Sequence, residues 1–92
     1  MPMRILIFGK HGDGAAYAAM AEVRSLVAEM RLDATVQIIT DPVQMANSGV
    51  DMPPAVSIDG LMVSTGWVPS RTELIRAIKQ RQEMMHKQPG LE

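Results

Sequence analysis

Two stretches of the chain carry residues that could do chemistry. The first is the loop Gly9-Lys10-His11-Gly12-Asp13-Gly14, and Tyr17 follows it by about one helical turn. His11, Asp13 and Tyr17 are candidate catalytic residues, because an imidazole and a carboxylate can work as an acid and base pair. Two such ligands fall short of the three or four that a metal site needs, so we expect no bound metal.

The same loop also has a purely structural interpretation. Asp13 stands where a helix N-cap is expected, and a capping carboxylate stabilises a helix by about 0.5–2 kcal/mol. The glycine spacing matches neither Gly-x-Gly-x-x-Gly nor a P-loop, so turn geometry explains Gly9, Gly12 and Gly14 better than phosphate binding. Lys10 could hold an anion at the start of the helix, but the negative charge of Asp13 opposes this.

The second stretch is Met52-Pro53-Pro54-Ala55, which runs directly into a short β-type segment. Proline lacks an amide hydrogen, so a Pro-Pro pair can precede a paired strand but cannot lie inside it. The bond between the two prolines is either a cis bond in a specific turn or a trans spacer, and spacing alone leaves both open.

Composition restricts the classes of function. The 92 residues contain no cysteine and nine methionines, and the formal net charge is −1. Without cysteine the chain forms no disulfide and offers no thiolate, and without a basic excess we expect no nucleic-acid partner. No apolar run is long enough to cross a bilayer or to form a signal peptide. We therefore expect a cytoplasmic protein without a membrane partner and without a cofactor.

Periodicity indicates the elements that position these stretches. Apolar runs and alternation predict strands, and three- and four-residue spacing of apolar residues predicts helices. Asp41-Pro42 opens a short helix, Asp59-Gly60 joins a hairpin, and Ser70 with Glu73 forms a capping box. The predicted order is strand 4–8, helix from 14, strand 34–39, short helix from 42, strands 55–58 and 61–64, and helix from 71.

This order predicts one α/β domain, βαβ followed by ββα, with helices packed on a four-stranded mixed sheet. We place the domain at residues 1–81. Residues 82–92 lack a core pattern and are predicted to be a tail, with His86 solvated. The final residues Leu91 and Glu92 are typical of a cloning remnant.

The residues from Gly49 to Gly60, followed by Ser64-Thr65-Gly66-Trp67-Val68-Pro69-Ser70, carry a family resemblance. They resemble the second half of small thioredoxin-like proteins, in particular the glutaredoxin-like redox-active-disulfide group. The likeness extends over about residues 3–80. It implies a thioredoxin-like fold and a cis bond between Pro53 and Pro54.

That family carries Cys-x-x-Cys at the start of the first helix, where the helix end favours a thiolate. The corresponding residues here are Asp13-Gly14-Ala15-Ala16. The resemblance therefore implies the scaffold of a dithiol oxidoreductase, while the absence of cysteine excludes dithiol exchange by this chain.

The function we expect is a redox-inactive binding module for a protein, a peptide or a small thiol compound. In thioredoxin-like proteins the residue before the cis-proline offers its backbone to the ligand, and here it is Pro53, which has a carbonyl but no amide hydrogen. Trp67 either adds a surface anchor or covers the margin of the sheet. The expected ligand-binding residues are Met52, Pro53, Pro54, Ala55, Gly12, Asp13 and Gly14.

Two alternatives stay open. One is an enzyme, either a glutathione-type reaction in which the ligand brings the sulfur or a cysteine-independent activity around His11 and Asp13. The other is a structural homodimer formed through a sheet edge or through helix faces. The chain is accordingly expected to be a monomer or a homodimer.

Overall fold

The computed structural model describes residues 2–86, apart from the side chain of His86. Residues 87–92, with the expected cloning remnant, and the expected solvation of His86 lie outside this description. The elements follow the predicted order: β1 (Met3–Phe8), α1 (Gly14–Glu29), β2 (Ala34–Ile39), α2 (Pro42–Asn47), β3 (Ala55–Ile58), β4 (Leu61–Thr65) and α3 (Arg71–His86).

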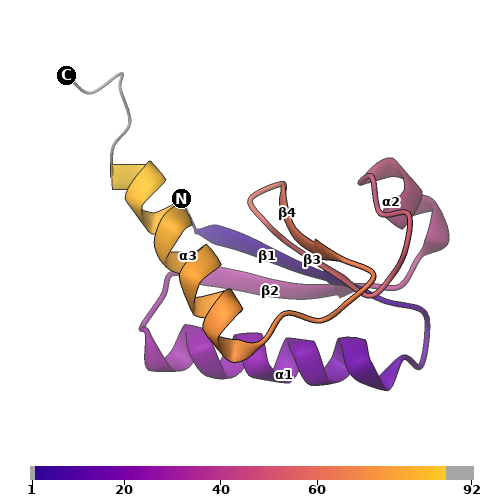
Figure 1. Cartoon of the computed structure of the whole chain (residues 1–92), viewed down its shortest axis with the longest axis horizontal. Helices are drawn as coiled ribbons and strands as arrows, with labels where there is room; N and C mark the ends of the chain where they lie inside the picture. The colour runs from indigo at the N-terminus through magenta and orange to yellow at the C-terminus, as the bar shows by residue number, and fades with distance from the viewer. Residues whose placement is uncertain (1, 87–92) are drawn as a thin grey trace.

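The four strands form one mixed sheet in the order β2-β1-β3-β4. β1 and β2 run parallel, because the crossover through α1 returns the chain to the same end of the sheet. β3 runs antiparallel to β1 and to β4, and β4 is an edge strand. Figure 1 shows α1 and α3 against the sheet, with α2 beyond one end of the strands. The predicted fold class is confirmed.

Alternation along β1 divides the core between the two faces of the sheet. Ile5 and Ile7 are at most 1% exposed and pack with α1 and α3 in the larger cluster. Phe8 points to the other face and packs with Met45 and Val50 in a smaller cluster beneath α2. α1 also contributes to the larger cluster, because its buried residues recur at three- and four-residue spacing: Ala16, Ala19, Val23 and Leu26.

All three predicted helix starts are confirmed. The carboxylate of Asp13 accepts a hydrogen bond from the amide of Ala15 at 2.9 Å, and the carboxylate of Asp41 accepts one from the amide of Val43 at 3.0 Å. At α3, the amide of Ser70 donates to Glu73 Oε1 at 3.0 Å, and the amide of Glu73 donates back to Ser70 Oγ at 3.2 Å. These side chains satisfy backbone donors that the first turn of a helix leaves without partners.

Three boundaries differ from the sequence-based prediction. β1 starts at Met3, one residue earlier than predicted. β4 runs to Thr65, one residue further than predicted, and its register with β3 shifts between Val56 and Ser57. α3 continues to His86, so the predicted domain boundary at residue 81 falls inside this helix. Met85 packs against the larger core cluster, and this contact stabilises the last turn of α3. Within residues 2–86, no helix is both long and apolar enough to cross a membrane.

Candidate functional site

The loop between β1 and α1 is built by one close approach and one cap. A Cβ atom on Gly9 would stand 2.3 Å from the Cβ of Ala16, so only glycine lets the end of β1 lie this close to α1. Gly12 has a φ of +82°, which favours glycine for conformational reasons. The amide of Asp13 donates to the carbonyl of Lys10 at 2.9 Å, and together these features fix the turn that leads into the helix.

The loop before β3 is held by the far end of β4. The hydroxyl of Thr65 donates to the carbonyl of Met52 at 3.2 Å, and the amide of Gly66 donates to the carbonyl of Pro54 at 2.8 Å. Between these two anchored carbonyls, the Pro53–Pro54 peptide bond is cis. Within residues 2–86, no hydrogen bond is recorded to the carbonyl of Pro53.

The side chain of Met52 covers the backbone at Gly66. A Cβ atom built on Gly66 would lie 3.3 Å from the Sδ atom of Met52, and Gly66 has a φ of +86°. Met52 itself is 66% exposed, and Trp67, which follows directly, is 46% exposed. The structure thus places two large and accessible apolar side chains beside the Pro-Pro segment.

A hollow of about 400 Å³ lies between these two loops. Its apolar part includes the buried Met45 and Val50, which belong to the small core cluster beneath α2. Polar groups from three loops surround it, so a ligand in this hollow would meet an apolar floor and a charged rim. The lining residues are Lys10, His11, Thr40, Pro42, Met45, Val50, Asp51 and Pro53.

The hollow brings together only some of the residues predicted from the sequence. Pro53 lines it, and so does His11, which was a candidate for catalysis rather than for binding. Five other predicted ligand-binding residues border the two loops without being among its lining residues: Gly12, Asp13, Gly14, Met52 and Pro54. Ala55 is fully buried beneath the hollow, in the same cluster as Met45.

Sequence reasoning missed several lining residues. Thr40 and Asp51 were overlooked because the loops that carry them show no recognisable motif. Met45 and Val50 precede the Pro-Pro pair in the sequence, but no motif or spacing sets Met45 apart from its apolar neighbours Val43 and Ala46. Lys10, which the sequence analysis considered as an anion contact opposed by Asp13, is also among the lining residues.

The three catalytic candidates do not form a common site. The carboxylate of Asp13 caps α1, Tyr17 is 42% exposed on the helix, and only His11 lines the hollow. No hydrogen bond in the described part of the chain joins any two of these side chains. Nor does any group of three histidine, cysteine, aspartate or glutamate residues in that part gather as a metal site would require.

The ion pairs between side chains in residues 2–86 lie elsewhere, and sequence reasoning missed them. Asp59 Oδ1 accepts from the amide of Arg4 at 2.7 Å, and Asp59 Oδ2 accepts from Nε of Arg81 at 2.8 Å. Burial alone would raise the pKa of Asp59, but the hydrogen bond from Arg81, that from Arg4 and the charge of Arg81 together hold it below its ordinary value. Asp59 therefore ties the hairpin turn to β1 and to α3.

A second charged contact joins two helices on the surface. Arg71 at the start of α3 pairs with Glu22 and Glu29 of α1. The hydrogen bond from Arg71, followed by that from Ser25, lowers the pKa of Glu29. Both charged contacts connect elements of the fold, and neither involves a residue that lines the hollow between the loops.

Comparison with known proteins supports the resemblance seen in the sequence. A search of curated proteins found no match to this chain. The family model described as thioredoxin domain matches residues 3–79, a range that includes both loops and six of the seven elements in full. The chain has no cysteine at any of its 92 positions, so the helix start that carries the reactive pair in that family is capped here by Asp13. The chain therefore belongs to the thioredoxin domain family, within its glutaredoxin-like group, as a member without cysteine.

Proposed function

We propose that this protein is a non-catalytic binding module, and that it holds an extended peptide segment of a partner in the hollow between the β1–α1 loop and the Met52–Ala55 loop. The observation that carries the proposal is the hollow itself. It has an apolar floor from Met45 and Val50, and both of its walls come from the loops that the fold places at the end of β1.

The backbone at Pro53 supports binding of an extended chain. Its carbonyl, without a recorded hydrogen bond within residues 2–86, is available to accept one from a ligand amide. Proline offers no amide in return, so the ligand makes one backbone hydrogen bond here instead of a pair. Affinity then depends on side chains, and we expect dissociation constants of about 0.1–1 mM for a short peptide.

The rim of the hollow indicates which ligand side chains would fit. Lys10 and His11 line the hollow from the β1–α1 loop and Asp51 lines it from the loop before β3, so a ligand that carries an acidic group beside an apolar one matches these residues. Met52 and Trp67 lie outside the hollow and are exposed enough to cover a neighbouring apolar residue of the ligand. Methionine suits this role because its unbranched side chain adapts to different surfaces.

The arrangement of the catalytic candidates favours binding over catalysis. The carboxylate of Asp13 already accepts the amide of Ala15, and Tyr17 is not among the lining residues. A convincing catalytic site needs a nucleophile, a base and an oxyanion donor that converge on one point. His11 could serve as a base, but none of the other catalytic candidates lines the hollow to supply a nucleophile or an oxyanion donor.

Amide chemical-shift mapping by NMR tests the proposal. The probes are a capped pentapeptide with a valine next to an aspartate and, separately, reduced glutathione. We expect the peptide to shift the amides of Lys10, His11, Asp51 and Met52, and Lys10→Glu to weaken binding about two- to fivefold. Arg24→Glu on the outer face of α1 is the matched charge control and should leave the titration unchanged.

Two results would overturn the proposal. One is the absence of any saturable shift with peptide up to about 5 mM, well above the expected dissociation constant. The other is a set of shifts centred away from the two loops. A response to glutathione but not to the peptide would replace the peptide with a small thiol compound as the ligand of the same hollow.

A further inference from the structure

A second hollow, of about 540 Å³, lies at the end of the sheet where β1 begins. Arg4 and Leu6 of β1 line it together, because alternate residues of a strand point to the same face of the sheet. The hairpin turn contributes Asp59, and α3 contributes Arg81 and Met85. The walls therefore combine apolar surface from Leu6 and Met85 with two guanidinium groups and one carboxylate.

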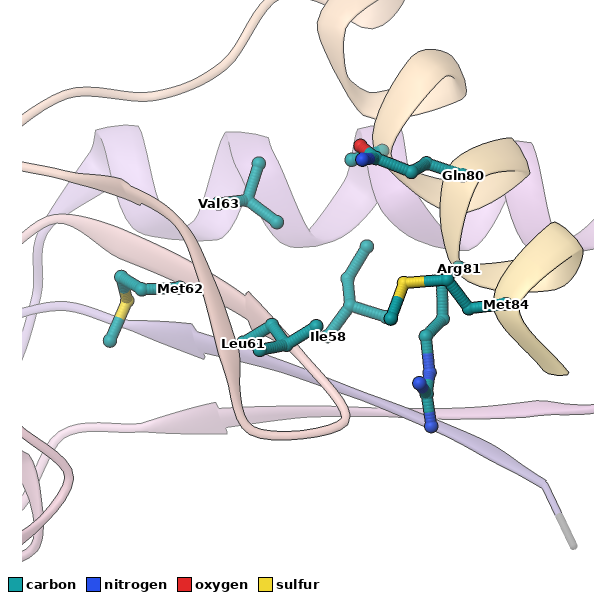
Figure 2. Close-up of a pocket in the computed structure, with 8 residues that line it drawn as sticks. Ile58, Leu61, Met62, Val63, Gln80, Arg81 and Met84 are labelled. Carbon is teal, nitrogen blue, oxygen red and sulfur yellow. The ribbon is translucent and has the colours of Figure 1, made fainter. Parts of the chain in front are cut away.

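The hairpin turn holds the side chain of Arg81 in place. Its Nε donates to Asp59 Oδ2 at 2.8 Å, and the side chain is only 27% exposed. Figure 2 shows this side chain extending away from Gln80, whereas that of Met84 on the same helix extends toward Ile58. Within residues 2–86, no hydrogen bond is recorded for either terminal nitrogen of Arg81. A guanidinium that is fixed through Nε can still donate from its terminal nitrogens to a ligand.

The side chain of Arg4 makes no recorded polar contact with any residue in the range 2–86. Its backbone amide, and not its guanidinium, donates to Asp59 Oδ1 at 2.7 Å. Asp59 pairs with Arg81, so this positive charge is balanced, while the charge of Arg4 is not. No other residue that lines the hollow is charged. The hollow therefore has one positive charge in excess.

We propose that this hollow binds an organic carboxylate, with the carboxylate between Arg4 and Arg81 and the hydrocarbon part on Leu6 and Met85. A guanidinium matches the two oxygens of a carboxylate, and its attraction is stronger where the surroundings are partly buried. Leu6 and Met85 are half-buried, so a hydrocarbon that covers them removes further apolar surface from water. Affinity thus needs both parts of the ligand.

The charge balance indicates a ligand with a single negative charge. A doubly charged phosphate would exceed the one unbalanced charge of Arg4, and it would also be repelled by the carboxylate of Asp59. A monovalent carboxylate suits the site better. Such a group occurs in free aliphatic acids and at the carboxyl end of a peptide, and both sources offer the same chemistry.

NMR titration of the full chain with hexanoate tests the proposal. We expect hexanoate to shift the amides of Arg4, Gly60 and Arg81, with a dissociation constant of about 1–5 mM. Acetate lacks the hydrocarbon, hexanamide lacks the charge, and inorganic phosphate lacks the first and exceeds the second. Each of these three probes should bind at least about fivefold more weakly.

Two further probes distinguish the sources of the carboxylate. Acetyl-alanyl-leucine has a free carboxyl end, and its amidated form does not. If the free form shifts the same amides and the amidated form does not, the carboxyl end of a peptide fits the hollow. If neither form binds while hexanoate does, the ligand is a free aliphatic acid.

The variant Arg4→Gln separates the ligand site from the fold. It removes the unbalanced charge but keeps the backbone amide that Asp59 accepts. We expect the dissociation constant for hexanoate to rise about five- to tenfold while the melting temperature stays nearly unchanged. Arg76→Gln is the matched control, because it makes the same change of charge on α3 outside this hollow, and it should leave the titration unchanged.

Several results would overturn the proposal. One is the absence of a saturable shift at this end of the sheet with hexanoate up to about 20 mM, well above the expected dissociation constant. Equal or tighter binding of acetate, hexanamide or phosphate is another, and so is an unchanged affinity in Arg4→Gln. Hexanoate shifts centred on Lys10 and His11 would place the anion in the first hollow instead. None of these results depends on peptide binding at that first hollow.

Discussion

The two hollows lie at opposite ends of the sheet and are built by different means. At the end where β1 stops, the loops are positioned by glycine contacts, a helix cap and prolines, and a backbone carbonyl and several polar side chains face a small cavity. At the end where β1 begins, the carboxylate of Asp59 in the hairpin turn accepts hydrogen bonds from Arg4 of β1 and Arg81 of α3, and the surface nearby is mainly apolar. Polar groups left open suit a ligand with its own hydrogen bonds, whereas apolar surface beside a guanidinium suits a ligand that joins a hydrocarbon part to a carboxylate.

Removal of the aromatic ring beneath the first hollow should have the largest effect. Phe8 is 1% exposed and packs with Met45 and Val50, which form the floor of the hollow. Because truncation leaves a cavity, we expect Phe8→Ala to lower the free energy of unfolding by about 3–5 kcal/mol, measured by urea denaturation. Phe8→Leu should lose less stability, keep the fold and weaken peptide binding at the first hollow. Unchanged peptide binding in Phe8→Leu would contradict the idea that Phe8 supports the residues beneath the hollow.

Substitution of the buried glycine should rank second. A methyl group at Gly9 would stand 2.3 Å from the Cβ of Ala16, so the strand and the helix must move apart. We expect Gly9→Ala to cost about 1–3 kcal/mol of stability and to displace the amide signals of the loop that carries His11. Gly14→Ala is the matched control, since nothing lies within 4 Å of a Cβ there, and it should be neutral or slightly stabilising. A harmless Gly9→Ala would show that this loop tolerates a wider separation than the structure has.

The elements were predictable from the sequence because each is encoded locally. Strands and helices can be predicted from periodicity. The caps at Asp13, Asp41 and Ser70 can be predicted because each is a typical capping residue directly before a helical segment. The site was only partly predictable. Pro53 could be predicted because it directly precedes Pro54 in the recognisable Pro-Pro pair. Thr40 and Asp51 could not, because they reach the hollow only through the fold, in which the end of β2 and the loop before β3 lie at the same end of the sheet. The role of Asp59 escaped prediction for a similar reason. Its partners lie 55 and 22 residues away, and Asp-Gly alone predicts only a turn.

The polar contacts at the other end of the sheet should have a smaller effect than the buried core. Asp59→Asn removes the charge that Arg81 faces and weakens the hydrogen bond from Arg4, and we expect a loss of about 1–2 kcal/mol near neutral pH. The pKa of Asp59 is lower in the folded protein than in the unfolded chain, so the carboxylate stabilises the fold fully above the unfolded value, about 3.9. This contribution disappears as the pH falls further, through the lowered pKa of the folded state.

Denaturation curves at several pH values therefore test this contact. The difference in stability between the wild-type protein and Asp59→Asn should be constant from about pH 5 to pH 8 and should shrink below about pH 4. A difference that grew on acidification would mean that the folded state raises the pKa of this carboxyl. Ligand binding at the first hollow should be unchanged in this variant, because Asp59 contacts none of the residues that line it.

The smallest effect is expected at the ion pairs between α1 and α3, although Arg71 contacts two carboxylates there. Arg71 and both glutamates are at least 40% exposed, so water and salt screen their attraction and the side chains lose freedom when they pair. Arg71→Gln should lower the melting temperature only slightly at low ionic strength, and the difference should vanish in about 1 M NaCl, where charges are screened within about 3 Å. Asp59→Asn, in contrast, should keep most of its deficit in the same salt, because its ion pair is less exposed. If both variants responded to salt alike, the difference in burial would not be what distinguishes the two contacts.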